Sequence, residues 1–170
     1  MKISSIRSFY VGVLMAGVTA AAPAAATGKV ITVTEKVDLA ASPSRSWDAI
    51  RDFMGWQVWH PAFAGTKLVK GEGSTQGSVR LLSAKDGAQF TEELVSYNPM
   101  SRTYKYRIME SPAPVADYIS TLEVREHNGG STVVWSSTFS VKPGTTEEEA
   151  KKLISGIYRL GLDNLAVVLK

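Results

Sequence analysis

The C-terminal segment, residues 145–170, carries the longest helical pattern in the sequence. Pro143 and Gly144 interrupt the segment before it, and Thr145 or Thr146 can cap a helix whose first turn holds three glutamates, where negative charge suits the positive helix end. Apolar residues then recur with a period close to 3.6 residues up to the end of the chain. A long amphipathic helix must bury its apolar stripe, and a curved sheet is the surface that the rest of the chain offers.

The N-terminal segment, residues 1–26, has the pattern of a secretory signal peptide. Two basic residues precede an uncharged apolar run at 9–22, and Ala24–Ala26 supplies small residues for a cleavage site. We therefore expect cleavage after Ala26 and a secreted or periplasmic protein, residues 27–170, that forms a single domain. The alternative is an uncleaved membrane anchor, for which the apolar run is short.

The charge balance argues against several classes of partner. The chain has 19 basic and 16 acidic residues, and loss of Lys2 and Arg7 with the leader would bring it close to neutrality. We see no basic stripe and expect no nucleic-acid partner. No later segment is long and apolar enough to span a bilayer, so we expect no stable membrane insertion once the leader is removed. The chain has no cysteine, so it can form no disulfide.

Between these two ends the sequence reads mostly as strands. Seven segments are predicted as strands from their alternation and turn residues: 30–39, 66–70, 78–84, 89–97, 102–109, 118–126 and 131–141. Ser42 and Pro43 predict the start of a short helix over 44–53, and the aromatic segment 54–63 can hold a second helical turn. Short turns between successive strands predict antiparallel pairing. The order predicts one α+β domain, in which a bent sheet around one long helix leaves an interior pocket.

Several sequence phrases, in this order and spacing, resemble the SRPBCC superfamily. The phrases are 41–53, Trp59, 77–80, 91–94, 118–120 and 143–148. The superfamily includes START domains, Bet v 1-like allergens, abscisic acid receptors and polyketide cyclase/dehydrase-type proteins. The last subgroup is the most similar, with secreted members that resemble the methanol-oxidation accessory protein MxaD. The resemblance implies the helix-grip fold, a curved seven-stranded antiparallel sheet wrapped around a long C-terminal helix with one or two short helices after strand 1. It also implies a cavity for a hydrophobic ligand.

Similarity to the abscisic acid receptors implies a set of cavity-facing residues. These are Leu82, Ala84, Phe90, Glu92, Tyr106, Tyr118, Ser120, Ser136, Leu153, Ile157 and Gly161. The spacing of these residues agrees with that placement. Strand residues two positions apart point to the same face of a sheet, and helix residues four positions apart lie on the same side of a helix. Trp135 is opposite in parity to Ser136 and is expected to face away from the cavity, either as a partner surface or packed on the convex face.

Two glycines interrupt the predicted C-terminal helix, where each costs about 1 kcal/mol relative to alanine. Gly161 is expected to leave room in the cavity, and Gly156 to let the helix approach the sheet closely. Tyr158 lies beside the predicted stripe and is left out of the site.

The sequence also departs from the receptor pattern. The lysine that anchors the hormone carboxylate is missing near Ala64, and Ser136 stands in place of an acid. Residues 83–87 and 111–114 replace the gate and latch loops. The resemblance therefore supports neither hormone sensing nor this particular ligand.

Glu92 is the polar residue with the most open role. It can accept a hydrogen bond from a ligand, act as a general acid or base, or form a structural ion pair with Arg80 on the neighbouring strand.

The aromatic segment offers Trp56, Trp59, His60 and Phe63 as a lid over the cavity mouth or as a seal of the core end. Two histidines without ligand spacing, and no phosphate- or dinucleotide-binding motif, predict neither metal nor cofactor.

Three functions follow from these features. The leading hypothesis is a secreted or periplasmic binding or transport protein for a small hydrophobic or amphipathic molecule such as a lipid, an aromatic or a polyketide-like compound. The enzyme hypothesis is a polyketide cyclase- or dehydratase-like activity with Glu92 as acid and base. The third is an MxaD-like periplasmic accessory protein that docks on a redox enzyme, with a periplasmic protein as its partner.

Overall fold

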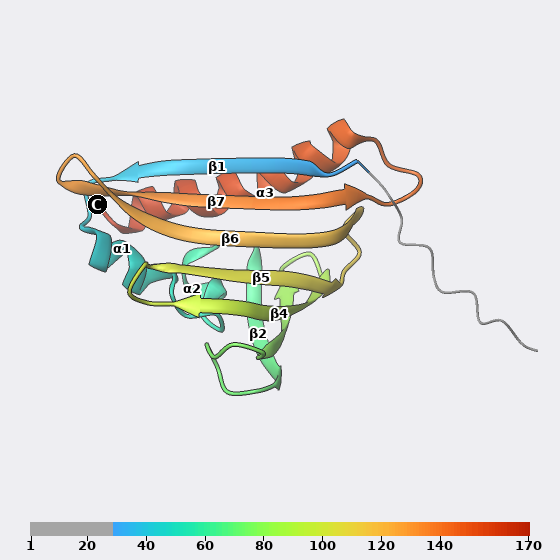
Figure 1. Cartoon of the computed structure of the whole chain (residues 1–170), viewed down its shortest axis with the longest axis horizontal. Helices are drawn as coiled ribbons and strands as arrows, with labels where there is room; N and C mark the ends of the chain where they lie inside the picture. The colour runs from blue at the N-terminus through green and yellow to red at the C-terminus, as the bar shows by residue number, and fades with distance from the viewer. Residues whose placement is uncertain (1–28) are drawn as a thin grey trace, which may run out of the picture.

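The chain folds into a seven-stranded antiparallel sheet that curves around a long C-terminal helix (Figure 1). This computed structural model describes residues 29–170, so the predicted signal peptide lies outside the described residues. The elements in chain order are β1 (Ile31–Leu39), α1 (Pro43–Ile50), α2 (Trp56–Trp59), β2 (Phe63–Lys70), β3 (Val79–Ala84), β4 (Gln89–Asn98), β5 (Thr103–Glu110), β6 (Val115–His127), β7 (Gly130–Val141) and α3 (Glu147–Val168). The spatial order of the strands is β1-β7-β6-β5-β4-β3-β2. The predicted helix-grip architecture is confirmed.

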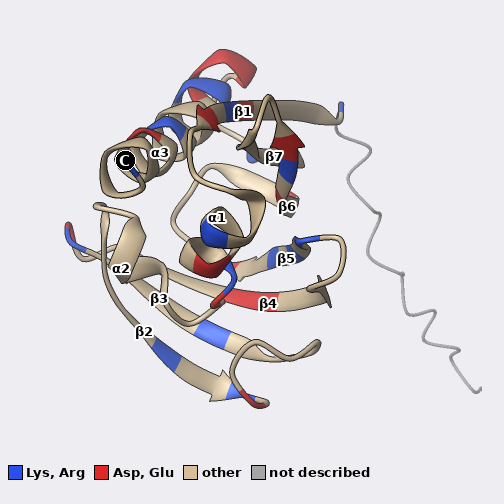
Figure 2. Cartoon of the chain, turned by 90° about the vertical axis from the view of Figure 1, so that its left-hand side faces the viewer, with Lys and Arg blue, Asp and Glu red and all other residues tan. Residues whose placement is uncertain are grey.

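The two short helices cover one end of the curved sheet (Figure 2). Ser42 caps α1, because its hydroxyl accepts a hydrogen bond from the backbone N–H of Arg45 at 3.3 Å, and Pro43 is the first helical residue. The helix ends at Ile50 rather than at Phe53, and the second helical turn forms as α2. The aromatic segment is therefore a compact corner between α1 and β2.

Helix α3 begins at a capping box. The hydroxyl of Thr146 accepts from the backbone N–H of Glu149 at 3.2 Å, and the carboxylate of Glu149 accepts from the backbone N–H of Thr146 at 2.9 Å. The helix then buries Ala150, Ile154, Tyr158, Gly161, Leu162 and Leu165. Within residues 29–170, no helix is long and apolar enough to cross a membrane.

The buried face of α3 differs by one residue from the predicted stripe. Leu153 is 43% exposed and Ile157 only half-buried, whereas Ile154 and Tyr158 are buried against the sheet. The sequence has apolar residues side by side at 153–154 and 157–158. Two stripes one residue apart therefore fit the helical period equally well, and only packing selects between them.

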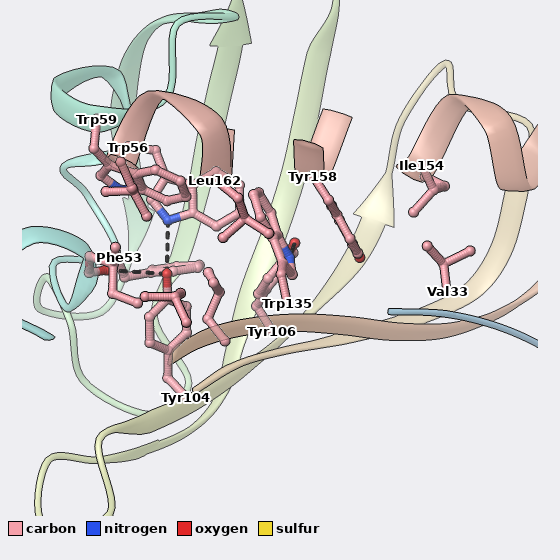
Figure 3. Close-up of a cluster of buried hydrophobic side chains, with 14 of the residues drawn as sticks. Val33, Phe53, Trp56, Trp59, Tyr104, Tyr106, Trp135, Ile154, Tyr158 and Leu162 are labelled. Carbon is pink, nitrogen blue, oxygen red and sulfur yellow. Dashed lines mark hydrogen bonds between the residues drawn. The ribbon is translucent and has the colours of Figure 1, made fainter. Parts of the chain in front are cut away.

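Aromatic side chains fill the space between the sheet and the helices (Figure 3). Trp56 lies edge-on to Trp135 with ring centroids 5.1 Å apart, and its indole N–H donates to the hydroxyl of Tyr104 at 3.0 Å. Edge-on pairs of this kind are favoured by the quadrupoles of the rings. The core is thus a closely packed aromatic cluster and not an open chamber.

Candidate ligand-binding site

A small cavity remains between the sheet, α2 and α3. Its volume is about 30 Å³, which is enough to admit a water molecule. Its walls are formed by Trp56, Phe63, Phe90, Glu92, Tyr106, Ile108, Ala113, Tyr118, Trp135, Ile154, Ile157 and Tyr158. In this closed form the protein cannot hold a molecule of the size that fills ligand pockets, which are about 300–1,000 Å³.

Gly161 does not enlarge the cavity, contrary to the sequence prediction. A Cβ atom at this position would lie 2.9 Å from Nε2 of His60 and from a ring carbon of Trp59. The missing side chain therefore lets α2 approach α3, and His60 and Trp59 occupy the space. Gly156 also differs from its prediction, because it is exposed and a Cβ there would meet no atom within 4 Å.

A cluster of hydroxyl groups lies at the centre of the core beside the cavity. The hydroxyls of Tyr106 and Tyr118 are 3.3 Å apart, and the hydroxyl of Tyr158 lies within hydrogen-bond distance of Tyr118 and 3.1 Å from the hydroxyl of Ser120. The indole N–H of Trp135 donates to Tyr106 at 3.1 Å and to Ser120 at 3.0 Å. Three strands, β5, β6 and β7, and helix α3 thus bring one polar centre together in an aromatic surrounding. We call these five residues the hydroxyl cluster.

Burial raises the pKa of all three tyrosines of the hydroxyl cluster well above the ordinary value. The phenols therefore stay protonated and neutral at physiological pH. A neutral phenol can both donate and accept a hydrogen bond, but it cannot serve as a base. The cluster is suited to orient a polar group of a ligand.

Trp135 faces the cavity and Ser136 faces outward, the reverse of the sequence prediction. The indole is completely buried, whereas Ser136 lies on the outer face with Thr32 and Thr121. The register of β7 explains this, because Trp135 pairs with the buried Leu122 of β6. The alternation of Val133, Trp135 and Phe139 marks the inner face, and alignment to the receptor pattern shifted that phase by one residue.

Arg80 and Glu92 form a buried ion pair at one wall of the cavity. Two guanidinium nitrogens of Arg80 donate to Oε2 of Glu92 at 2.8 and 2.6 Å, and a third donates to the backbone carbonyl of Phe53. The guanidinium also lies 3.9 Å from the ring centroids of Phe53 and Trp56. The ion pair that the sequence offered as one role of Glu92 is present.

The second carboxylate oxygen of Glu92, Oε1, is not used in the ion pair. Both hydrogen bonds from Arg80 end on Oε2, and Oε1 forms none with the described residues. Burial raises the pKa of Glu92, and the positive charge of Arg80 opposes that shift. Oε1 is therefore available as a hydrogen-bond acceptor at the cavity wall.

The aromatic corner after α1 lies inside the core. Trp56, Trp59, His60 and Phe63 are all buried, as expected for a seal at the end of the core. Nδ1 of His60 accepts from the backbone N–H of Ala62 at 3.2 Å, so Nε2 carries the proton and donates to the carbonyl of Ile157 at 3.0 Å. Burial lowers the pKa of His60 to about 4. The uncharged side chain of His60 therefore links the end of α2 to α3 through this hydrogen bond.

The structure brings together most, but not all, of the predicted site residues. Phe90, Glu92, Tyr106, Tyr118 and Ile157 line the cavity, and Ser120 lies behind the tyrosine hydroxyls. Leu82 is buried in the core and Ala84 packs against it without reaching the cavity wall. Ser136 and Leu153 face outward.

Sequence reasoning missed several residues of the cavity wall. They are Ile108, Ala113, Trp135, Ile154 and Tyr158. Alternation along β7 and the correct phase of α3 would have found Trp135, Ile154 and Tyr158. Ala113 belongs to a loop, for which no period exists. Among the described residues, no group of three acidic, histidine or cysteine side chains is arranged to hold a metal ion.

Comparison with known proteins gives a consistent set of similarities. Residues 30–170 match the family model described as polyketide cyclase / dehydrase and lipid transport. The solved structure of XoxI from Bacillus cereus is 35% identical with a TM-score of 0.75, over 81% of this chain and 94% of that chain. A Thermobifida fusca protein is 28% identical with a TM-score of 0.71, over 79% and 90%. Ara h 8.0201, at 17% identity and a TM-score of 0.69 over 82% and 97%, shares the fold.

Proposed function

The chain belongs to the polyketide cyclase / dehydrase and lipid transport family, and from this premise we propose that it binds a small hydrophobic or amphipathic molecule between the sheet, α2 and α3. The observation that carries the proposal is the hydroxyl cluster, which lies beside a cavity in an otherwise aromatic core. Buried polar groups stabilise a fold less well than apolar groups of the same shape. A core that served stability alone would have no need of five hydrogen-bonding side chains at one point.

The proposed ligand chemistry follows from the cavity walls. Indole and phenyl rings of Trp56, Trp135 and Phe90 offer flat apolar contacts. Tyr118, Tyr158 and Oε1 of Glu92 offer neutral donors and one acceptor. A compact ring system or acyl chain that carries an oxygen function would satisfy both parts of this surface.

Ligand binding requires the cavity to expand about tenfold, from about 30 Å³ to the lower end of the range for ligand pockets. Phe90 and Ile157 are half-buried, so they can move outward without entering another part of the core. The closed form described above is then the empty state, and the ligand stabilises an open one by binding it preferentially.

Direct detection of the ligand tests this proposal. Native mass spectrometry of the protein purified without detergent should show a bound small molecule, which denaturing conditions should release. The uncharged dye N-phenyl-1-naphthylamine should bind, and Tyr118→Phe should weaken it by about threefold to tenfold, the value of one hydrogen bond. Tyr97→Phe is the matched control, since Tyr97 lies outside the cavity wall. A protein that carries nothing and takes up no dye would overturn the proposal.

An enzymatic role is the second candidate, and the free Oε1 of Glu92 favours it. A cyclase or dehydratase needs a group that transfers a proton at the substrate, and Glu92 lines the cavity. Glu92→Gln keeps the shape and one acceptor oxygen, but it removes the negative charge beside Arg80 and replaces the other oxygen by an N–H donor. Turnover of a polyketide-like substrate that vanishes in this variant, with binding retained, would favour the enzyme over the binding protein.

Docking on a redox enzyme through Trp135 finds no support in the geometry. The hypothesis needed an exposed indole, and this one is completely buried on the inner face. A partner would have to use another surface.

Our proposal places the protein in the periplasm or outside the cell, on the basis of the leader pattern in residues 1–26. Intact mass measured on protein from the periplasmic fraction of a bacterial host tests this. The mass should match residues 27–170, and a full-length mass would contradict the cleavage.

A further inference from the structure

The strands β5 and β6 separate at one end of the sheet. Their pairing runs from Thr103–Glu123 to Arg107–Ile119 and ends there. Beyond this point β5 continues on β4, and β6 continues on β7. The separated ends, residues 108–111 and 115–118, are here called the fork. It lies at the end of the sheet away from α1 and the C-terminus (Figure 1).

A bulge in β6 shapes the fork. The register with β7 shifts between Ala116 and Ile119, and Asp117 adopts a left-handed backbone with φ of 53°. The hydroxyl of Ser140 donates to the carboxylate of Asp117 at 3.2 Å and holds the bulge in place. Val115 and Tyr118 consequently both point into the core, while Ala116 lies on the groove between the separated strands.

The fork opens a groove of about 630 Å³ on the outer side of the sheet, a volume within the range of ligand pockets. Ile108 and Tyr118 line this groove and also line the internal cavity. These two side chains therefore form a wall that the groove shares with the internal cavity. The groove is about twenty times larger than the internal cavity, so the two together offer room that the cavity alone lacks.

The loop that joins β5 to β6 is held by Lys142, the residue that follows β7. Nζ of Lys142 donates to the carbonyls of Ser111 at 3.1 Å and of Ala113 at 2.9 Å. Ser111 and Lys142 line the groove, whereas Ala113 lines the cavity. The hydroxyl of Ser111 is buried and has no hydrogen-bond partner among the described residues.

The charges of the groove are mixed. Arg107 is paired with Glu93, Lys142 is directed at two carbonyls, and Glu110 and Asp117 lie at the exposed rim. This balance gives no preference for an anion over a cation. It suits an uncharged polar or zwitterionic group, while Met109 and Ile119, which are 52% and 44% exposed, provide apolar contact.

We propose that the fork is the outer half of the ligand site. A single-chain amphiphile places its uncharged or zwitterionic head in the groove and passes its apolar tail between Ile108 and Tyr118 into the aromatic core. This inference rests on the proposed binding function and adds the entry route and the orientation of the ligand. Separation of two side chains admits the tail while the paired part of the sheet stays intact.

Position-dependent quenching tests the orientation. Trp56 and Trp135 line the cavity, and a nitroxide quenches tryptophan fluorescence only at close range. The probes are the methyl esters of 5-doxyl and 16-doxyl stearic acid, which carry the nitroxide near the head and near the tail end respectively. At equal occupancy the 16-doxyl ester should quench more strongly. Equal or stronger quenching by the 5-doxyl ester would overturn the proposed orientation.

A filled groove tests the route. Ala116→Phe should weaken binding of both esters by about tenfold or more, because the ring occupies the groove. Thr121→Phe is the matched control on the same strand, since Thr121 lies in the paired part of the sheet and outside the groove. Equal affinity of the two variants would overturn the proposed entry route through the fork, and the binding proposal itself would stand. Failure of both esters and of N-phenyl-1-naphthylamine to bind the unaltered protein would overturn both proposals.

Discussion

Trp135 of β7 and Tyr158 of α3 stack face to face, with ring centroids 4.2 Å apart and ring planes 13° from parallel. The contact joins β7, the neighbour of the edge strand β1, to the middle of the long helix (Figure 3). Both residues also belong to the hydroxyl cluster, through the indole N–H and the phenol. The same pair therefore fixes the position of the helix on the sheet and forms one wall of the candidate site.

Removal of the Tyr158 hydroxyl separates the stacking contact from the hydrogen bonds. Tyr158→Phe keeps the ring but leaves Tyr118 and Ser120 each with one partner fewer. We expect the free energy of unfolding to fall by about 1–2 kcal/mol, measured by urea denaturation. Tyr97→Phe is the control, because the hydroxyl of Tyr97 forms no hydrogen bond with the described residues; its change should stay within about 0.5 kcal/mol. Equal losses in the two variants would contradict the role given to the cluster.

Loss of one partner of the buried ion pair should cost far more than loss of both. Arg80→Met leaves the carboxylate of Glu92 buried without its counter-ion, so we expect a loss of about 3–5 kcal/mol. The double variant Arg80→Met/Glu92→Leu removes both charges and should recover most of that loss. A double-mutant cycle by urea denaturation measures the coupling. Additive losses would show that the two side chains do not depend on each other.

The elements of this fold could be predicted from sequence because each carries a local signal. Alternation marks the strands, Ser42 with Pro43 marks α1, and the capping residues Thr146 and Glu149 mark α3. These signals depend on neighbours in the chain, so no knowledge of the tertiary structure was needed. The strand ends differ from prediction by up to three residues. At these positions the hydrogen bonds to the neighbouring strand, and not the side-chain alternation, determine where the strand ends.

Which face of a helix or strand is buried is harder to predict than whether the helix or strand forms. Leu153 and Ile154 are both apolar, and only the packing of Tyr158 on Trp135 decides which of them faces the sheet. On β7 the spacing of Val133, Trp135 and Phe139 does indicate which face of the strand is buried. The receptor pattern led to the other phase and placed Ser136 inside.

The size of the cavity could not be predicted at all. It depends on how the rings of Trp56, Trp59 and His60 fill the space that Gly161 leaves free. That arrangement joins residues about a hundred positions apart in the chain. The separation of β5 from β6 also lacks a local signal, because a bulge at Asp117 and a missing ladder have no fixed residue pattern.

His60 should make the protein less stable in mildly acidic solution. Its pKa falls from an ordinary 6.5 to about 4 in the folded protein, because burial disfavours the charged ring. The unfolded chain therefore binds a proton at a higher pH than the folded one. The contribution of His60 is fully present above pH 6.5 and is lost as pH falls toward 4, by at most about 3 kcal/mol.

Urea denaturation at several pH values between 7 and 4.5 measures this effect. The variant His60→Gln retains a side-chain donor and acceptor but does not titrate, so its stability should vary less over this range. His127 is exposed at the end of β6, and His127→Gln serves as the matched control that should keep the slope of the unaltered protein. A slope that persists in His60→Gln would assign the pH dependence to other groups.

The two glycines of α3 should respond in opposite ways to alanine. Gly156→Ala adds a methyl group where no atom lies within 4 Å and replaces the poorest helix former other than proline, so the free energy of unfolding should rise by about 0.5–1 kcal/mol. Gly161→Ala gains the same helix propensity but forces a methyl group against His60 and Trp59, and overpacking of this kind costs about 1–3 kcal/mol. Thermal and urea denaturation of the two variants compare the same substitution on one helix five residues apart. Stabilisation by Gly161→Ala would mean that α2 can move away from α3 at little cost, which would make the aromatic corner, and not the fork, the easier place for the core to open.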